Sequence, residues 1–375
     1  MTLPMKPKRS AYMEWAKTGS LARFNLATSG LTSMPISELP FRLEQIEITG
    51  PGGYGYEPLQ TRLARHSGVP QDCVVAATGA SMANHLAMAA VLDPGDEVLI
   101  EQPTYGLLLD IANYLGARIN RFPRKFAEEF SVDPAQIEKN LTAKTRLIVL
   151  TNLHNPSGAL VPAASLRAIG QMAQGAGAHV LVDEVYLEMM FDGNAPFSFS
   201  IGQALAADDN PFIVTNSLTK AYGFSGVRCG WILAAPKLAQ KIWRLNDLFG
   251  VNAAHPAELM SVAVLDHLPR FRDRAQNVLA TNRQLLKHFL DSRADLECFQ
   301  PPAGTVMFAR LRQGDSEAFF KLLREKYETT VVPGRFFEMP QHFRIGVGAE
   351  TATVRGGLER LSTALDEFAS RKSVH

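Results

Sequence analysis

Short apolar runs alternate with helical patterns between residues 70 and 235, and this alternation constrains the fold more than any other feature of the sequence. The runs cover residues 73–78, 96–100, 146–151, 179–182, 212–215 and 232–234. Strands of a parallel sheet are buried on both faces and read as continuous apolar runs, while the segments between them supply the covering helices. The alternation therefore predicts an α/β fold with a mostly parallel sheet covered by helices on both faces.

The pattern changes after about residue 270. A long helical pattern over 271–292 is followed by predicted strands at 305–311, 329–332 and 342–348 and by predicted helices at 316–327 and 353–370. Strands flanked by helices in this way predict a smaller α+β domain. We therefore expect a large domain over residues 35–270 and a small domain formed by an N-terminal arm, residues 1–34, together with residues 271–375.

The composition excludes several classes of function. The formal net charge of +1 gives no reason to expect nucleic acid or an anionic membrane as a partner. No apolar run approaches the length of a membrane span, and the basic residues within positions 1–9 are not followed by the apolar core of a secretory signal. Cys73, Cys229 and Cys298 are far apart and show no metal-ligand spacing, which predicts a cytoplasmic protein without a metal site.

Chemically active residue types gather where the predicted strands end. The residues concerned are Gly79, Tyr105, Asn155, Asp183, Ser217 and Lys220. Open α/β sheets bind ligands at the carboxyl edge of their strands. Independent turns and helix caps would not be expected to share one edge, so this coincidence predicts a ligand site there.

Lys220 follows the apolar run 212–215, with Ser217 before it and Arg228 eight residues after it. A lysine at the end of a buried strand is costly unless it is partnered or its pKa is lowered, and a lowered pKa makes its amine a nucleophile for aldehydes. A serine hydroxyl and an arginine guanidinium on either side suit a phosphate. The stretch therefore indicates pyridoxal phosphate, an aldehyde with a phosphate tail. The alternative is a surface loop with a solvated lysine.

Other signals have an ordinary structural explanation beside a functional one. Gly79, Ala80 and Ser81 open a predicted helix whose amino end could hold a phosphate, although Ser81 could equally be a plain N-cap. Asn155 begins an Asn-Pro-Ser-Gly turn that needs no ligand to explain it. Tyr105 could stack on a planar ring or simply be a core or surface residue.

Charged residues on two predicted strands are also candidates. Asp183 and Glu184 end an apolar run, and we expect one of these acids to face the ligand, where it would keep a ring nitrogen protonated, and the other to face solvent. Arg344 alternates with Phe343 and Ile345 and so points to the opposite face of its strand. There it could bind a carboxylate bidentately or be solvated.

In combination, these segments resemble the class I/II aminotransferases, the fold-type I enzymes that depend on pyridoxal phosphate. The resemblance covers residues 50–348. The segments that carry it, in this order and spacing, are Asn155-Pro-Ser-Gly158, Asp183-Glu-Val-Tyr186, Ser217-Leu-Thr-Lys220 and Arg228. The resemblance implies an aspartate-aminotransferase-like fold, whose large domain would bind the cofactor.

The resemblance also implies a role for each residue of the motifs. Lys220 would hold the cofactor as a Schiff base and move the proton between the substrate Cα and the cofactor. Asp183 would pair with the pyridinium nitrogen, so that the ring can withdraw electrons. Asn155 and Tyr186 would hydrogen-bond the phenolic oxygen of the ring, and Tyr105 would stack on the ring.

The remaining positions would bind the phosphate and the substrate. The phosphate would be held by Gly79, Ala80, Ser81, Ser217 and Arg228. Arg344 would clamp the α-carboxylate of the substrate, with Gly30 and Asn155 beside it. Tyr54, or Tyr56 in its place, would reach the phosphate of the neighbouring subunit, which implies a homodimer with shared sites.

The sequence departs from the family pattern in two places. The family's glycine five residues after this tyrosine is Leu59 here, and its Leu-Arg pair is Leu63 followed by Ala64. No second arginine is evident for a side-chain carboxylate, although Arg23 and Arg42 stay open. The sequence therefore does not indicate which amino acid is bound.

Three interpretations of function follow. The resemblance implies transfer of an amino group between an L-amino acid and a 2-oxo acid. A lyase on the same scaffold (a C–S β-lyase, a decarboxylase or an ACC-synthase-like enzyme) would share the ring-binding residues and is the second interpretation. A binding or effector module is the third, and it is disfavoured because the residues before Gly50 are too few for an added DNA-binding domain and hold no basic run.

Overall fold

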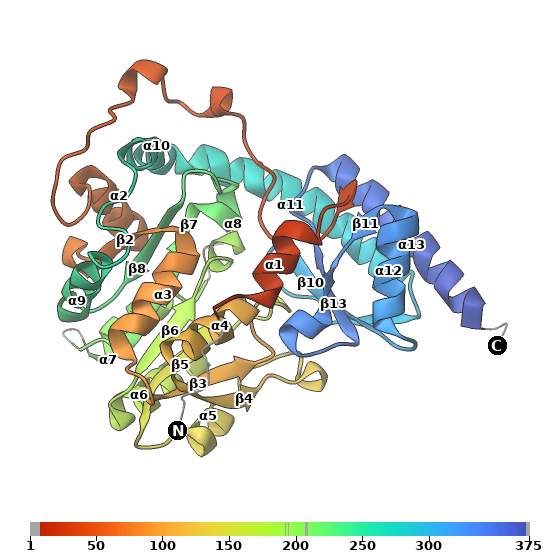
Figure 1. The fold of residues 1–375 in the computed structure, drawn as a ribbon, viewed down its shortest axis with the longest axis horizontal. Helices are drawn as coiled ribbons and strands as arrows, with labels where there is room; N and C mark the ends of the chain where they lie inside the picture. Colours follow the sequence, from red (N-terminus) through yellow and green to blue (C-terminus); the bar gives the residue numbers. More distant parts are fainter. Residues whose placement is uncertain (1–7, 192, 194, 207–208, 373–375) are drawn as a thin grey trace.

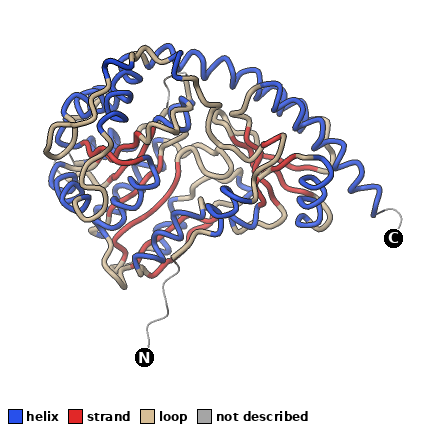
Figure 2. Tube along the Cα trace, turned by 45° about the horizontal axis from the view of Figure 1, so that its top comes forward, coloured by secondary structure: helices blue, strands red, loops and turns tan. Residues whose placement is uncertain are grey.

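The computed structural model describes residues 8–191, 193, 195–206 and 209–372, and most of its strands form one large and one small sheet (Figure 1, Figure 2). The large sheet has seven strands in the order β2-β8-β7-β6-β5-β3-β4. They are β2 (Val74–Thr78), β3 (Glu97–Gln102), β4 (Arg118–Pro123), β5 (Thr145–Thr151), β6 (His179–Asp183), β7 (Phe212–Ser217) and β8 (Cys229–Leu233). Only β8 runs antiparallel to its neighbours, so the prediction of a mostly parallel sheet is confirmed.

Alternating side chains of the central strands pack on opposite faces of the large sheet. In β5, Leu147 and Val149 belong to one core cluster, and Ile148 and Leu150 belong to another on the other face. All four side chains are fully buried because helices cover both faces. The first cluster is covered by α3 (Gly79–Val91), α4 (Gly106–Leu115) and α9 (Pro236–Asn246), and the second by α5 (Pro134–Asn140), α6 (Ala163–Ala176) and α7 (Ser198–Leu205).

The small sheet is antiparallel, with four strands in the order β12-β13-β10-β9. Its strands are β9 (Leu296–Cys298), β10 (Val306–Leu311), β12 (Val332–Pro333) and β13 (His342–Gly346), and the helices near it are α12 (Ser316–Tyr327) and α13 (Thr351–Lys372). Helix α11 (Leu268–Asp291) extends from α10 (His255–Asp266) toward α13 and so runs from the large sheet to the small one (Figure 1).

The N-terminal arm joins the C-terminal part of the chain. Strand β1 (Phe24–Asn25) pairs in parallel with β11 (Thr329–Thr330). Helix α1 (Ala11–Thr18) contacts α4 and lies between the two sheets in Figure 1. The domain boundaries expected at residues 34 and 270 stay a prediction, although the two sheets lie on either side of the second boundary.

One further helix borders the edge of the large sheet where its parallel strands end, and another packs beside β2. Helix α8 (Leu218–Tyr222) follows β7 without a loop, and α2 (Glu57–Ser67) packs against β2 and α10. Helix α3 follows β2 equally directly. Short strand-to-helix connections of this kind fix the residues at the junction, because backbone hydrogen bonds hold both sides of it.

Candidate active site

A cavity of about 210 Å³ lies at the carboxyl edge of the large sheet. It is lined by Tyr12, Met13, Ser29, Ala80, Ser81, Asn84, Tyr105, Thr151, Asn155, Asp183, Val185, Tyr186, Ser217, Thr219, Lys220 and Arg228. Because β8 runs antiparallel to its neighbours, its amino end lies at this same edge and places Arg228 in the cavity. Most of the residues predicted for the ligand site are thus together.

Lys220 lies in α8, directly after β7, and its side chain lines the cavity. Its Nζ donates a hydrogen bond to Ser29 Oγ at 3.1 Å. Burial lowers the pKa of Lys220, and the positive charges of Arg344 and Arg228 act in the same direction. A solvated surface lysine is therefore the wrong interpretation, and the amine has the character of a nucleophile.

Asp183 is the last residue of β6 and is buried at the cavity. Its Oδ2 accepts a hydrogen bond from Asn84 Nδ2 at 2.8 Å, and its Oδ1 accepts one from the Val185 amide at 3.2 Å. Asn84 is itself fixed, because its Oδ1 accepts a hydrogen bond from Thr215 Oγ1 at 2.7 Å. Burial raises the pKa of Asp183, and the hydrogen bond from Asn84 opposes that rise. The carboxylate suits a protonated ring nitrogen.

Glu184 does not face solvent, and the expectation that one acid of the pair would do so is wrong. Its side chain is fully buried and accepts hydrogen bonds from the Ser198 hydroxyl and, at 3.1 Å, from the Ser198 amide at the start of α7. Burial raises the pKa of Glu184 to about 8, so the group is protonated at neutral pH. Both acids are buried, but only Asp183 lines the cavity.

The amino end of α3 carries no side-chain cap. Thr78 is the N-cap residue and makes no capping hydrogen bond, whereas Ser81 lies inside the first turn and lines the cavity. Ser81 is therefore not the N-cap. Gly79 has a φ of +76°, and a Cβ there would come within 2.3 Å of Arg228 Nη2, so only glycine lets this guanidinium approach. Open amides beside a cation form a site for a phosphate.

Arg344 is buried on β13, on the opposite face from Phe343 and Ile345, as the strand alternation predicts. Its Nη1 donates to Asn155 Oδ1 at 2.8 Å, and its Nη2 donates to the Tyr12 hydroxyl at 3.0 Å. Its Nε has no partner, and Arg344 forms no ion pair within the part of the chain that the structure describes. A buried cation with an open donor fits an anionic ligand.

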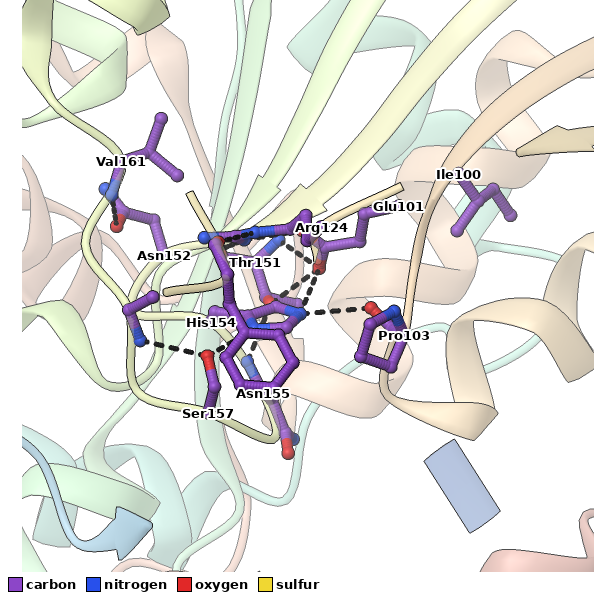
Figure 3. Close-up of polar contacts among 12 residues, drawn as sticks. Ile100, Glu101, Pro103, Arg124, Thr151, Asn152, His154, Asn155, Ser157 and Val161 are labelled. Carbon is purple, nitrogen blue, oxygen red and sulfur yellow. Dashed lines mark hydrogen bonds and ion pairs between the residues drawn. The ribbon is translucent and has the colours of Figure 1, made fainter. Parts of the chain in front are cut away.

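A buried polar network holds the loop that carries Asn155 (Figure 3). The Thr151 hydroxyl donates to Glu101 Oε1 at 2.7 Å and accepts from the Asn155 amide at 2.8 Å. Glu101 Oε2 in turn accepts from Arg124 Nη1 at 2.7 Å. In Figure 3 the carboxamide of Asn155 points away from this network. The buried network therefore fixes the backbone of this loop and leaves the Asn155 carboxamide free to contact other groups, which a plain surface turn would not require.

Four predicted residues do not line the cavity. Gly79 and Arg344 adjoin it through Arg228 and Asn155, whereas Tyr54 and Gly30 lie outside it. Tyr54 is 56% exposed, and its hydroxyl donates to Asp247 Oδ2 at 3.1 Å, so it does not reach the site of its own chain. Gly30 lines an adjoining cavity, where a Cβ would lie 3.6 Å from Lys220 Cδ. Sequence reasoning missed Tyr12, which contacts Arg344, and it missed the residues that hydrogen-bond Asp183 and Lys220.

The fold and this set of residues define an α/β enzyme that depends on pyridoxal phosphate. The sequence model described as "Aminotransferase class I and II" matches residues 47–361. Because that match covers most of the chain, the protein belongs to the class I and II aminotransferase family, and pyridoxal 5′-phosphate is its cofactor.

Proteins with different activities are similar to this chain. Capreomycidine synthase of Streptomyces vinaceus is 26% identical over 364 residues, which are 93% of this chain and 91% of that protein. The arginine–pyruvate transaminase AruH of Pseudomonas aeruginosa is 26% identical over 327 residues, which are 84% of this chain and 81% of that protein. The crystal structure of a PLP-dependent aminotransferase from Streptococcus suis covers 97% of this chain and 99% of its own, with a TM-score of 0.90 and 24% identity, and shows the same fold.

The residues of the cavity fit this cofactor. Asp183 offers a carboxylate for the ring nitrogen, Arg228 offers a cation for the phosphate beside the open amides of α3, and Lys220 offers an amine for the aldehyde. Within the described residues there is no cluster of side chains that could hold a metal ion. No helix of the described chain is long and apolar enough to cross a membrane.

Proposed function

We propose that this protein is an aminotransferase that moves an amino group between an L-amino acid and a 2-oxo acid. Arg344 carries the proposal, because it is a buried guanidinium with an open Nε, and its side-chain hydrogen-bond partners among the described residues are one carboxamide and one hydroxyl. The α-carboxylate of an amino acid or a 2-oxo acid would supply both the missing charge and the missing acceptor. The Asn155 side chain joins this clamp to the cavity that holds Lys220.

The residues of the site would divide the chemistry among them. Pyridoxal phosphate supplies an aldehyde that condenses with amines and a ring that withdraws electrons. Lys220 Nζ would take the proton from the substrate Cα, because burial lowers the pKa of this amine and so favours its neutral form. Arg344 and Asn155 would orient the carboxylate, and Asp183 would keep the ring nitrogen protonated. Orientation of this kind can supply about 7–11 kcal/mol of a barrier.

The test is the visible absorption spectrum of the holoenzyme while single L-amino acids are added without a 2-oxo acid. Transamination should convert the cofactor band once and then stop, with one equivalent of 2-oxo acid released. Lys220→Ala should lower the rate at least ~100-fold, because it removes the general base, whereas the exposed Lys237→Ala should not. Amino transfer by Lys220→Ala at the wild-type rate would overturn the proposal.

A lyase is the second candidate. It is favoured by the similarity to capreomycidine synthase over nearly the whole chain, since that relative is named a synthase and not a transaminase. The same spectra separate the two reactions. A lyase would regenerate the cofactor band, and keto acid would accumulate over many turnovers although no 2-oxo acid had been added.

We further propose a homodimer whose subunits share their sites. Leu43, Ile48 and Leu248 are 78%, 86% and 78% exposed, and the hydrogen bond of Tyr54 to Asp247 joins the two segments that carry them. A second copy would cover this apolar surface and bring Tyr54 to the phosphate of the neighbouring subunit. Sedimentation equilibrium should give a dimer, and Leu248→Glu should weaken it. A monomeric wild-type protein would contradict the proposal.

The proposed partners are therefore an amino acid, a 2-oxo acid and a second copy of this chain. Cys73, Cys229 and Cys298 are free thiols in the structure. A cytoplasmic location stays a prediction from their pattern in the sequence.

A further inference from the structure

A second cavity, of about 260 Å³, adjoins the site on the side of the N-terminal arm. It is lined by Tyr12, Met13, Trp15, Ala16, Ser20, Ala27, Thr28, Ser29, Gly30, Leu31, Tyr105, Thr219, Lys220 and Ser225. Tyr12, Met13, Ser29, Tyr105, Thr219 and Lys220 line both cavities. A substrate whose α-carboxylate meets Arg344, which contacts Tyr12, would therefore have this second cavity within reach of its side chain.

One face of α1 forms the wall of this cavity. Trp15 is held in place by Phe336, with ring centroids 5.2 Å apart, and by Gly19, where a Cβ would come within 2.6 Å of the indole. Met13 is held by a hydrogen bond from the Tyr105 hydroxyl to its Sδ at 3.5 Å. The wall is thus apolar and fixed by its own contacts, as a preformed binding surface requires.

The charges of α1 lie away from the wall. Glu14 and Lys17 are exposed and do not line the cavity. Among the described residues that line this cavity, only Lys220 carries a formal charge on its side chain. Burial raises the pKa of Tyr105 well above its usual value, so this phenol stays neutral.

The arginines left open by the sequence lie elsewhere. Arg23 is exposed and pairs with Glu328 at 3.7 Å, and Arg42 is exposed and pairs with Glu44 at 3.8 Å. Neither side chain lines either cavity of its own chain. In the part of the cavity that this chain supplies, a carboxylate on the substrate side chain would meet hydroxyl groups but no cation other than Lys220, whose amine the cofactor aldehyde would take. A guanidinium there would meet no carboxylate. Both charged groups would therefore be less favourable in this cavity than an uncharged side chain.

We propose that the cavity beneath α1 receives an uncharged, mainly apolar side chain, so that the substrates are neutral L-amino acids with aromatic or large aliphatic side chains. This inference rests on the proposed transamination, because it assumes that the α-amino and α-carboxylate groups lie in the first cavity. It assigns α1 the role of a specificity element. Burial of apolar surface against Trp15 and Met13 would favour such side chains.

The first experiment compares half-reactions of the holoenzyme with L-phenylalanine, L-leucine, L-aspartate, L-glutamate and L-arginine. The rate constant divided by the dissociation constant should be at least ~100-fold larger for the two neutral amino acids. A preference for aspartate, glutamate or arginine would overturn the inference, and so would equal rates. If no amino acid reacts, the proposed transamination fails, and the inference is then decided by binding alone.

Binding is measured by calorimetry with carboxylates that cannot react. The holoenzyme should bind 3-phenylpropionate at least ~10-fold more tightly than glutarate, because only the second compound buries an additional charge. This measurement does not depend on turnover. Tighter binding of glutarate, or equal binding, would overturn the inference even in an active aminotransferase.

Three variants on α1 locate the effect. Trp15→Ala should weaken binding of 3-phenylpropionate about 10-fold, and Met13→Glu should weaken it further, because it adds a charge to the wall. Lys17→Ala, on the exposed face of the same helix, is the matched control and should bind like the wild type. Unchanged affinity in both wall variants, with helix content retained in circular dichroism, would show that the side chain lies elsewhere and overturn the inference.

Discussion

The Ser29 hydroxyl accepts a hydrogen bond from the Lys220 amine at 3.1 Å, which ties the N-terminal arm to the proposed catalytic lysine. The position of Ser29 is fixed, because its carbonyl accepts a hydrogen bond from Thr305 Oγ1 at 2.7 Å. The same hydroxyl opposes the rise in the pKa of Tyr186 that burial causes. Ser29 therefore holds Lys220 from a segment that precedes the large sheet in the chain.

Ser29→Ala should slow the proton transfer at the substrate Cα. The variant loses one hydrogen bond of about 1 kcal/mol, so we expect kcat to fall roughly 5- to 10-fold with little change in KM. Because the lost acceptor favours the protonated amine, the pKa of Lys220 should also fall further. The measurements are the deuterium isotope effect with 2-deutero substrate and the pH dependence of cofactor uptake by the cofactor-free protein.

The control for this serine is Ser316→Ala, which removes a buried hydroxyl hydrogen-bonded to the Pro340 carbonyl in the C-terminal part. It should leave both measurements as in the wild type. If Ser29→Ala shows the same isotope effect and the same pH midpoint as Ser316→Ala, the hydroxyl does not position the lysine.

Arg344→Lys should impair substrate binding but not cofactor binding. The planar guanidinium of Arg344 donates to Asn155 and Tyr12 and still has Nε free for a ligand. The ammonium of a lysine cannot reproduce this geometry, so the exchange is not conservative. We expect kcat/KM for the amino acid to fall by about 100-fold or more, mainly through KM. The absorption band and the dissociation constant of the cofactor should stay unchanged.

Tyr12→Phe serves as the graded comparison for this arginine. It removes one of two acceptors for Arg344 Nη2, the other being the Ala27 carbonyl at 3.3 Å, and it keeps the ring that packs edge-on against Tyr105 at 5.5 Å. Its effect on KM should be about 10-fold at most. A variant Arg344→Lys that behaves like Tyr12→Phe would argue against a carboxylate clamp.

The sequence predicts the site residues that follow strands, because chain direction alone brings them to one edge. Asp183 ends β6 and Lys220 follows β7, so the parallel sheet suffices to place both. Tyr12 and Ser29 belong to the arm, whose position depends on the pairing of β1 with β11 near the other end of the chain, and no local pattern reveals that pairing. Asn84 could have been found, since it stands one helical turn after Ser81 on α3.

Context that is not local also explains the wrong predictions. The sequence predicts that one acid of the pair Asp183 and Glu184 faces solvent, but Ser198 supplies hydrogen bonds that allow Glu184 to be buried as well. Strand β4 escapes notice because it is the edge strand of the large sheet, where Arg118 and Asn120 remain partly or fully exposed and break the apolar pattern. At such positions, burial and secondary structure depend on contacts with residues far away in the sequence.

Glu184 should make the protein less stable as the pH rises. Its pKa is raised by burial to about 8 in the folded state, against about 4.3 in an unfolded chain, so the folded state holds a proton that the unfolded state releases between these values. Its contribution to the free energy of unfolding is therefore fully present below about pH 4 and declines until about pH 8, by a few kcal/mol. Thermal unfolding followed from pH 5 to pH 9 measures this decline.

Glu184→Gln mimics the protonated acid and should flatten this part of the stability profile. The variant should be more stable than the wild type at pH 8 to 9 and similar to it near pH 5. Glu14→Gln, at an exposed position on α1, is the control and should follow the wild type. Parallel profiles for Glu184→Gln and the wild type would show that Glu184 does not titrate in this range.

The buried pair of Glu101 and Arg124 should tolerate joint replacement better than loss of the arginine alone. Both side chains are fully buried, and Glu101 also accepts hydrogen bonds from the Thr151 amide and hydroxyl at 2.8 Å and 2.7 Å. Arg124→Met leaves a buried carboxylate without its counter-ion and should lower the free energy of unfolding by about 3–5 kcal/mol. Adding Glu101→Gln removes that charge and should recover part of the loss, because the carboxamide can still accept from Thr151. Urea unfolding of the two single variants and the double variant measures the coupling energy between the two residues.

The same pair should also affect substrate binding, because the Thr151 hydroxyl that Glu101 holds accepts a hydrogen bond from the Asn155 amide at 2.8 Å. Arg124→Met should therefore raise KM for the amino acid. Additive losses of stability together with an unchanged KM would show that the pair neither couples nor supports the carboxylate clamp.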